Sequence, residues 1–269
     1  MPTYLPHLAM RLGVALMSCV MLMAAAAAPE PKPVLSSNTK IATIAVTIDP
    51  ALKATPGLYD NLLAEGQRQF ATWRAEADKT ARTDDFTFKN GGKYNFSRSY
   101  TQRSSIGRYV SIVRSDETFE GGAHPGQLID TILWDRDAKK RISIRPFFKE
   151  TADKGPTMTA MAKLVRVAVF DEKKRRKLET IEGTPENNEW LKDITPNLLK
   201  LGPVTLAPSS EPNKSSGLTF HFSPYMVGPY AEGPLSAFVP WSAFKDHLSA
   251  EGAALFGGTR PDADVAKDD

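Results

Sequence analysis

The histidines are the first candidates for proton transfer or metal binding. Four occur, one of them in an N-terminal segment that we expect to be removed, so that His124, His221 and His247 remain. An imidazole beside a carboxylate can act as a general acid or base, or bind a metal, and Glu120 and Asp130 flank His124. None of the histidines has the close spacing of a helical metal site. We therefore expect no metal, no other cofactor and no catalytic residue; a catalytic set built on His124 is the alternative.

The stretch Phe119–Gly126 reads Phe-Glu-Gly-Gly-Ala-His-Pro-Gly and lies between two runs rich in β-branched and aromatic residues, 109–113 and 128–134. Glycine adopts positive φ at low cost, so this stretch predicts a β-hairpin with an elaborated loop. The histidine either contacts a ligand or anchors the loop by hydrogen bonding. The ligand-binding candidates in this loop are Glu120, Gly121, Gly122 and His124.

A second loop, 223–234, is dense in proline and glycine and is therefore expected to be rigid. It carries Tyr225, Tyr230 and Glu232, and aromatic and charged groups on rigid loops make effective recognition surfaces. We take these three residues as further ligand-binding candidates. The alternative is that both tyrosines pack beneath the loop and fix its shape.

Composition excludes several other kinds of chemistry. Cys19 is the one cysteine, so the chain without its N-terminal segment has no disulfide, thiol nucleophile or cysteine-bound metal. No Gly-x-Ser-x-Gly motif occurs. The 34 basic and 31 acidic residues nearly balance, so we expect no nucleic acid partner. The basic run 173–177 indicates a solvated face near a helix C-terminus, or less favourably a contact with an anionic envelope polymer or lipid headgroup.

The N-terminus predicts export. Arg11 precedes the apolar run Leu12–Met23 and the small residues Ala24–Ala28, which is the pattern of a secretory signal peptide. We expect residues 1–27 to be cleaved off and the protein to be periplasmic or secreted. Membrane association is expected only if this segment stays uncleaved or Cys19 is lipidated.

Hydrophobic periodicity predicts an α+β fold, a mainly antiparallel sheet with two long helices packed on it. Residues 28–40 are expected to be a linker, and residues 251–269 a disordered tail. The two halves of the chain, 41–115 and 116–250, are expected to share one sheet system. The expected strands are 41–49, 93–103, 104–113, 128–134, 141–144, 218–222 and 237–240. Three helices are expected: one that begins after Thr55, one over 157–181 and one over 241–250. The segment 190–201 is expected to be helical or irregular.

Three stretches carry a family resemblance: the Gly-Gly-Ala-His loop, the segment 134–148 with Ile142-Ser143-Ile144 and Phe147-Phe148, and the Tyr225/Tyr230–Gly233 loop. Together they resemble the extracytoplasmic bacterial domain shared by the anti-sigma factor RsiV and the non-catalytic region of the peptidoglycan deacetylase PdaC. Region 41–115 is the PdaC-like part and region 116–250 the RsiV-like part.

This resemblance implies an exported recognition domain, since relatives of the family include a lysozyme receptor. The deacetylase Asp-Asp and His-x-x-x-His set is missing, so deacetylation is not implied, and only eleven residues through Arg11 precede the apolar run, so we expect no sigma-factor binding. We expect a non-catalytic binding protein that recognises a cell-envelope component such as peptidoglycan, or a lysozyme-like protein. The alternative is a cell-wall glycan hydrolase or a deacetylase-associated enzyme.

Overall fold

The structure, a computed structural model, describes residues 31–83 and 92–265. Residues Pro31–Asp269 form one compact unit. The predicted signal peptide, its cleavage site and Cys19 lie outside the described residues. Within the described ranges, no helix is both long and apolar enough to cross a membrane.

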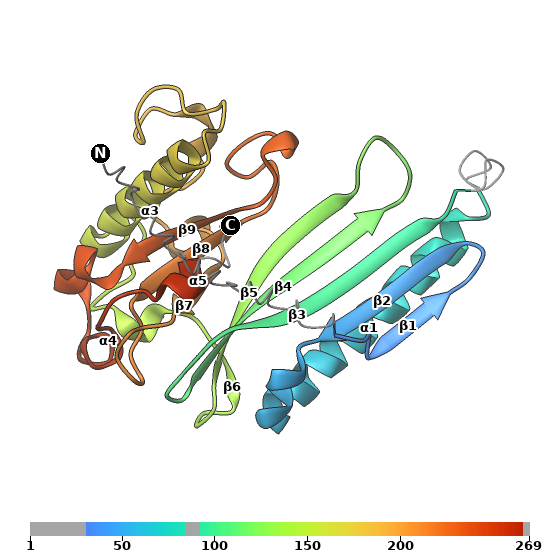
Figure 1. Cartoon of the computed structure of the whole chain (residues 1–269), viewed down its shortest axis with the longest axis horizontal. Coiled ribbons are helices and arrows are strands. Elements are labelled where there is room, and N and C mark those ends of the chain that lie inside the picture. Colours follow the sequence, from blue (N-terminus) through green and yellow to red (C-terminus); the bar gives the residue numbers. More distant parts are fainter. Residues whose placement is uncertain (1–30, 84–91, 266–269) are drawn as a thin grey trace, which may run out of the picture. The chain divides into compact units, whose positions relative to one another are not determined.

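A six-stranded sheet is built mainly from the first half of the chain (Figure 1). All neighbouring strands are antiparallel except β2 and β3, which run parallel because the long helix α1 connects them. In spatial order, the sheet consists of β1 (Leu35–Asn38), β2 (Ala42–Ile48), β3 (Tyr94–Ile106), β4 (Tyr109–Phe119), β5 (Gly126–Asp135) and β6 (Lys140–Ile142).

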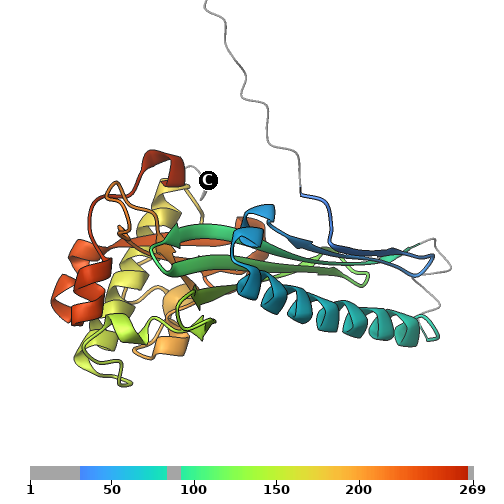
Figure 2. The same ribbon diagram turned by 90° about the horizontal axis from the view of Figure 1, so that it is seen from below.

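Helix α1 (Pro56–Thr80) covers one face of this sheet (Figure 2). Strand β2 alternates strictly, so every second side chain, from Ala42 to Ile48, is buried on the helix side. At Gly66 helix and sheet approach so closely that a Cβ would lie 2.8 Å from Cγ1 of Val46. The predicted N-cap Thr55 does occupy the cap position, but its hydroxyl accepts a hydrogen bond from Arg136 instead of capping the helix.

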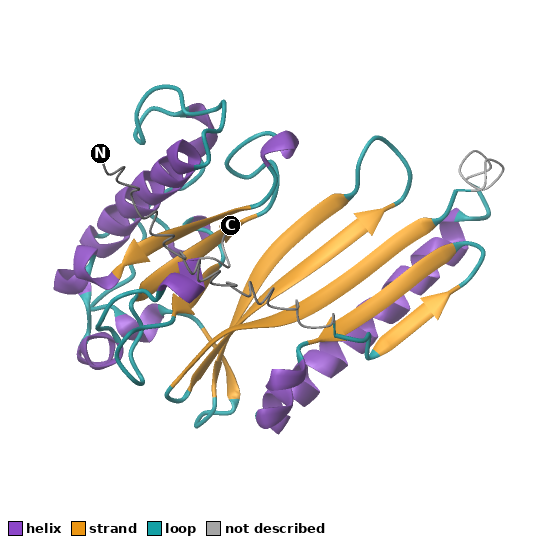
Figure 3. Cartoon of the chain, in the orientation of Figure 1, coloured by secondary structure: helices purple, strands orange, loops and turns teal. Residues whose placement is uncertain are grey.

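A second, three-stranded sheet packs against helix α3 (Pro156–Arg175) in the other half of the chain (Figure 3). It consists of β7 (Val204–Ala207), β8 (Gly217–Phe222) and β9 (Leu235–Pro240), all antiparallel. Every residue of β8 is buried. Met158, Met161, Val165 and Val169 of α3 join the same hydrophobic core as Phe220 and Phe222.

Hydroxyl groups join β7 to the first sheet. The Oγ atom of Ser104 donates to the carbonyl oxygen of Leu206 at 2.7 Å, and the Leu206 amide donates to Oγ of Ser111 at 3.1 Å. The Val204 amide donates to Oγ1 of Thr131 at 2.9 Å. Because these contacts use side chains in place of a backbone ladder, the two sheets remain separate.

The remaining elements are short. They are the helices α4 (Ala250–Leu255) and α5 (Asp262–Val265) and the 3-10 turns η1 (Pro50–Ala54), η2 (Arg145–Phe147), η3 (Glu189–Leu191), η4 (Leu198–Lys200), η5 (Tyr230–Glu232), η6 (Trp241–Ala243) and η7 (Lys245–His247).

The α+β class, with a mainly antiparallel sheet and two long helices, is confirmed. The expectation of one sheet system was wrong, because the strands after α3 form their own sheet. The expected division at residues 115 and 116 falls inside β4. Helix α3 ends at Arg175 and not at 181. Lys177 adopts a left-handed φ of 56°, and the Leu178 amide donates back to the carbonyl of Lys173, which is typical of a helix end.

Both ends of the described chain are more ordered than expected. Residues 35–38 of the expected linker form β1, which pairs with β2. The expected helix 241–250 is instead two 3-10 turns, and α4 follows it. The expected disordered tail 251–269 was wrong for its described part, because Asp264 is buried and forms ion pairs with Arg103 and Arg260. Residues 266–269 lie outside the described residues.

Candidate functional site

The two predicted loops meet at three aromatic rings, which we call the aromatic triad: His124, Tyr225 and Tyr230. The imidazole of His124 stacks on the ring of Tyr230, with 3.7 Å between centroids and 17° between planes. The hydroxyl of Tyr225 lies 3.2 Å from Nε2 of His124, and Nδ1 lies 3.1 Å from the carbonyl oxygen of Pro125. Since a carbonyl can only accept, Nδ1 carries a proton, and in the neutral ring Nε2 accepts from the tyrosine hydroxyl.

Backbone conformation explains why each loop can place its ring. Gly121 and Gly122 have φ values of 91° and 104°, which only glycine adopts freely. Tyr225 has a φ of 72°, an uncommon conformation for a side chain of its size, and it is 58% exposed. Such a conformation costs about 1–2 kcal/mol. His124 is exposed and Tyr230 is half-buried, so the triad lies at the surface and the tyrosines are not hidden beneath their loop.

Glu232, the third candidate of the second loop, lies apart from the triad. Its carboxylate accepts from Nζ of Lys173 at 2.8 Å and from the hydroxyl of Thr180 at 2.5 Å. Burial alone would raise the pKa of Glu232, but the hydrogen bonds from Lys173 and Thr180 outweigh it and lower the pKa. Glu232 therefore anchors the loop, and Glu120 is an exposed residue of the hairpin loop.

Lys173 corrects the interpretation of the basic run 173–177. Its side chain is fully buried, with an exposed fraction of 0%, and it pairs with Glu232. Arg175 and Arg176 turn back to Glu172 at 2.7 Å and 2.6 Å. The run therefore contains one core cation and two guanidiniums that already have a carboxylate partner, and the expected solvated face was wrong for Lys173.

The three histidines do not form a common site. His221 is buried between the hydroxyls of Thr205 and Ser236, at 2.9 Å and 3.0 Å, and burial lowers its pKa to about 3, with the nearby Arg103 and Arg260 adding to the effect. His247 lies 3.2 Å from the hydroxyl of Thr157.

Asp130, the remaining member of the alternative catalytic set, accepts from Arg114 at 2.9 Å. Across residues 31–83 and 92–265, no three acidic, histidine or cysteine side chains are grouped so that they could hold a metal ion. The alternative catalytic set around His124 is thus distributed over separate, hydrogen-bonded positions.

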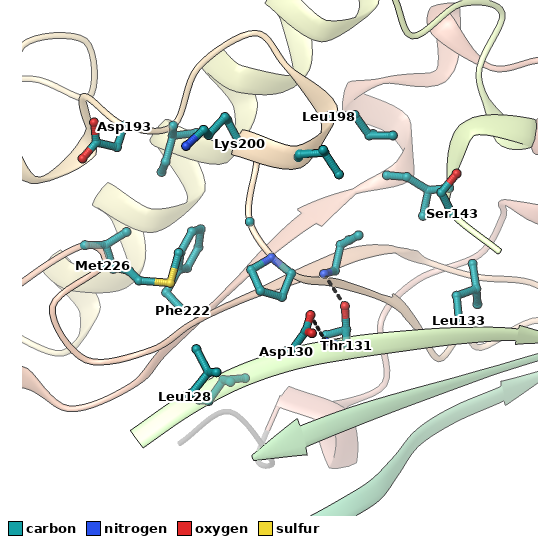
Figure 4. Close-up of a pocket in the computed structure, with 18 of the residues that line it drawn as sticks. Leu128, Asp130, Thr131, Leu133, Ser143, Asp193, Leu198, Lys200, Phe222 and Met226 are labelled. Carbon is teal, nitrogen blue, oxygen red and sulfur yellow. Dashed lines mark hydrogen bonds between the residues drawn. The ribbon is translucent and has the colours of Figure 1, made fainter. Parts of the chain in front are cut away.

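Next to the triad lies a feature that sequence reasoning missed, a pocket of about 560 Å³, which we call the apolar pocket (Figure 4). Strand β5, the segment after β6, turn η4 with the start of β7, and the end of β8 with the following loop form its walls. Its aliphatic and aromatic lining consists of Leu128, Ile129, Leu133, Ile142, Ile144, Ile194, Leu198, Leu199, Pro203, Val204, Phe222, Met226 and Val227, and its polar lining of Asp130, Thr131, Ser143, Asp193 and Lys200.

Large apolar side chains are exposed around this pocket. Leu128 is 53% exposed, Leu199 85% and Met226 44%. Tyr225 of the triad directly precedes Met226, so the triad and the pocket are neighbours. Single exposed apolar residues are normal on a protein surface, whereas a group of them beside a pocket marks a binding site.

Hydrogen bonds hold the walls in place. The Ile129 amide donates to Oγ of Ser223 at 2.8 Å, which fixes the second loop against β5. The Asn197 side chain accepts from the Leu199 amide at 2.9 Å and so caps turn η4, which carries the most exposed of the rim residues. The pocket is therefore built by anchored segments.

Comparison with known proteins supports this fold. Residues 147–242, from η2 through β9, match the family model described as "Protein of unknown function (DUF3298)". The comparison with curated proteins returns no match.

The solved structures that are similar to this chain include two DUF3298 family proteins. A member of the DUF3298 family from Bacteroides fragilis NCTC 9343 has a TM-score of 0.53 and 15% identity, over 80% of this chain and 91% of that chain. A DUF3298 family protein from Pseudomonas aeruginosa PAO1 has a TM-score of 0.51 and 17% identity, over 83% of this chain and 95% of that chain. At these identities the likeness shows a shared fold and says nothing of a ligand.

Proposed function

We propose that this protein is an exported, non-catalytic binding protein whose recognition surface is the aromatic triad together with the apolar pocket. One observation carries the proposal. Of the six large apolar side chains that are exposed in the described residues, four border this one surface: Leu128, Leu199, Tyr225 and Met226. Buried aromatic and aliphatic anchors are what binding sites use most for affinity.

The partner that we propose is a cell-envelope component such as peptidoglycan, or a lysozyme-like protein. Support comes from the resemblance of the Gly-Gly-Ala-His and Tyr-x-x-x-x-Tyr loops to the RsiV and PdaC domain, since the triad is formed by residues of those two motifs. The predicted signal peptide supports a periplasmic or secreted location.

A cell-wall glycan hydrolase is the second candidate, and the structure favours it less. The residues of a catalytic acid–base pair must lie close enough together to hydrogen-bond to the same reacting group of the substrate. The described histidines instead face separate partners, and the Asp130 carboxylate is engaged by Arg114.

Calorimetric titration tests the proposal. The protein without residues 1–27, which keeps the compact unit Pro31–Asp269, is titrated with lysozyme and separately with soluble peptidoglycan fragments. We expect saturable binding at micromolar affinity or tighter with one of them, and a loss of about tenfold or more in Tyr225→Ala, a hot-spot effect of about 1.4 kcal/mol.

Trp190→Ala is the matched control, because Trp190 is an exposed aromatic residue that does not line the apolar pocket. It should leave the affinity unchanged. The absence of heat with both ligands would rule out both named partners, and equal losses in the two variants would remove the triad from the site.

A further inference from the structure

We propose that the apolar pocket binds the aliphatic chain of a single-chain amphiphile whose anionic head lies against Lys200. The inference rests on the proposed binding function and names a ligand class for the pocket half of its surface. A volume of about 560 Å³ lies within the range of small-molecule sites, roughly 300–1,000 Å³, so the pocket takes a whole ligand more readily than one side chain.

The polar groups inside the pocket already have protein partners. The hydroxyl of Thr131 accepts a hydrogen bond from the Val204 amide at 2.9 Å. Asp130 accepts from Arg114 at 2.9 Å and from the Thr131 amide at 2.7 Å. The hydroxyl of Ser143 accepts a hydrogen bond from the Arg145 amide at 3.3 Å. A ligand that enters this part of the pocket meets polar groups that already accept hydrogen bonds from the protein, between aliphatic walls, which favours an apolar chain over a polar molecule.

Two of the three charged groups of the lining, Lys200 and Asp193, lie toward one end, and the third, Asp130, lies beside Thr131 on β5. Figure 4 shows Lys200 and Asp193 on one side of the pocket, and Leu133 on the other. Within the described residues, the Lys200 ammonium makes no hydrogen bond or ion pair, and it is exposed on turn η4. Asp193 is exposed as well and acts electrostatically on its neighbour Lys192. The pocket is therefore apolar along most of its length, and its polar end carries one cation, Lys200, together with the carboxylate of Asp193.

The exposed rim fits a chain that lies across the mouth. Three exposed side chains form this rim: Leu128, Leu199 and Met226. A ligand removes them from water only if it extends from the pocket floor to the rim. Each buried methylene contributes about 0.8 kcal/mol, which is about a fourfold gain in affinity. A small polar ligand would leave these three side chains in water and would gain none of this free energy.

A series of alkyl phosphates with 10, 12 and 14 carbons, titrated below their micelle concentrations into the protein without residues 1–27, tests the chain. We expect the affinity to rise about fourfold for each added methylene until the pocket is full. Leu199→Ser and Met226→Ser should flatten this rise, and Trp190→Ser, the matched exposed control, should not. An affinity that is independent of chain length, or equal effects of all three variants, would overturn the inference.

The head group is tested with dodecyl phosphate against the uncharged dodecyl maltoside. Lys200→Gln should weaken the binding of dodecyl phosphate by about threefold to fivefold, which is the range of an exposed charge pair. The affinity for the maltoside should stay unchanged. Asp193→Asn should strengthen the binding of dodecyl phosphate, because it removes a carboxylate whose negative charge repels the phosphate. An equal response of both ligands to Lys200→Gln would overturn the assignment of the head.

The outcomes separate this inference from the proposed function. If lysozyme or peptidoglycan binds and no alkyl phosphate does, the inference is wrong and the proposed function stands. If the alkyl phosphates bind with the expected chain-length dependence and neither macromolecule binds, the inference stands and the named partners are wrong. Competition between dodecyl phosphate and a bound macromolecule would place both ligands on the same surface.

Discussion

The two ends of the loop 223–234 carry different residues that serve different purposes. At its start, Tyr225 and Met226 are exposed, and the tyrosine reaches His124 of the hairpin loop through one hydrogen bond. At its end, Glu232 accepts from the fully buried Lys173 and from Thr180. One end presents side chains to solvent, and the other end attaches the loop to α3.

The exposed residues Tyr225 and Met226 thus lie between two anchors of the loop, Ser223 against β5 and Glu232 against α3. A charge removed from water is stable only when it is paired and hydrogen-bonded, so the Lys173–Glu232 contact tolerates little change. Exposed aromatic contacts contribute less to stability and remain available to a ligand. Variants at the anchored end should therefore affect folding, and variants at the presenting end should affect binding.

The largest effect is expected from Lys173→Met, which leaves the Glu232 carboxylate without its cation. Removing one partner of a buried pair costs about 3–5 kcal/mol of the free energy of unfolding. Urea unfolding measures this loss. Lys163→Met, the same change at an exposed position of the same helix, should cost less than about 0.5 kcal/mol. Equal costs for the two variants would show that the pair does not anchor the loop.

The pH dependence of stability isolates Glu232 at the anchored end. Its folded-state pKa lies below the ordinary value of 4.5, so its contribution is complete above pH 4.5 and is lost as the pH falls through the folded pKa. Urea unfolding between pH 6 and pH 3 should show a steeper acid loss in the wild type than in Lys173→Met. Glu65, Glu150 and Glu172 also have lowered pKa values, and their contributions are present in both proteins and cancel in this comparison. Parallel curves would contradict the assignment.

A moderate effect is expected from Gly228→Ala, in the middle of the loop. An added Cβ would overlap Oε2 of Glu232 and lie 2.9 Å from Nζ of Lys173. Overpacking of this kind costs about 1–3 kcal/mol of the free energy of unfolding. Gly57→Ala is the control, since its nearest neighbour would be Trp134 at 3.9 Å. A neutral Gly228→Ala would mean that the pair shifts freely to make room.

The smallest effect on stability is expected at the presenting end. His124→Ala removes one exposed ring from the triad and should cost less than about 1 kcal/mol of the free energy of unfolding. Binding of the ligand identified by titration should fall with it, while Tyr225→Phe, which loses only the hydroxyl, should have a smaller effect on binding. A large loss of stability with unchanged binding would make His124 a loop anchor and not a ligand contact.

Much of the fold follows from local patterns. The alternation in β2, the helical stripe that includes Leu62, Gly66 and Trp73, and the glycine hairpin before β5 all predicted the elements that the structure contains. The strands 218–222 and 237–240 were also predicted and lie within β8 and β9, but β7 and the separation of these strands into a second sheet were missed. Strand β7 is short and β8 is buried on both faces, so no alternation marks which face is solvated.

The candidate site was predicted in part. Both loops were identified from their glycine, proline and aromatic residues, but their contact depends on residues 101 positions apart. The apolar pocket could not be found, since its walls come from four separated stretches of the chain. The pairs Lys173–Glu232 and Arg103–Asp264 were likewise missed, because a charged residue reads as exposed until its distant partner is known.

The sequence patterns predicted both long helices, most of the strands and the glycine turns, because these depend on neighbouring side chains and on backbone preferences. The sequence also carries the export pattern, which stays a prediction. Which charges are buried, which rings stack and where the apolar pocket lies became clear only from the folded structure. These features depend on the free energy of desolvation, which is set by what the fold brings together and not by the residue alone.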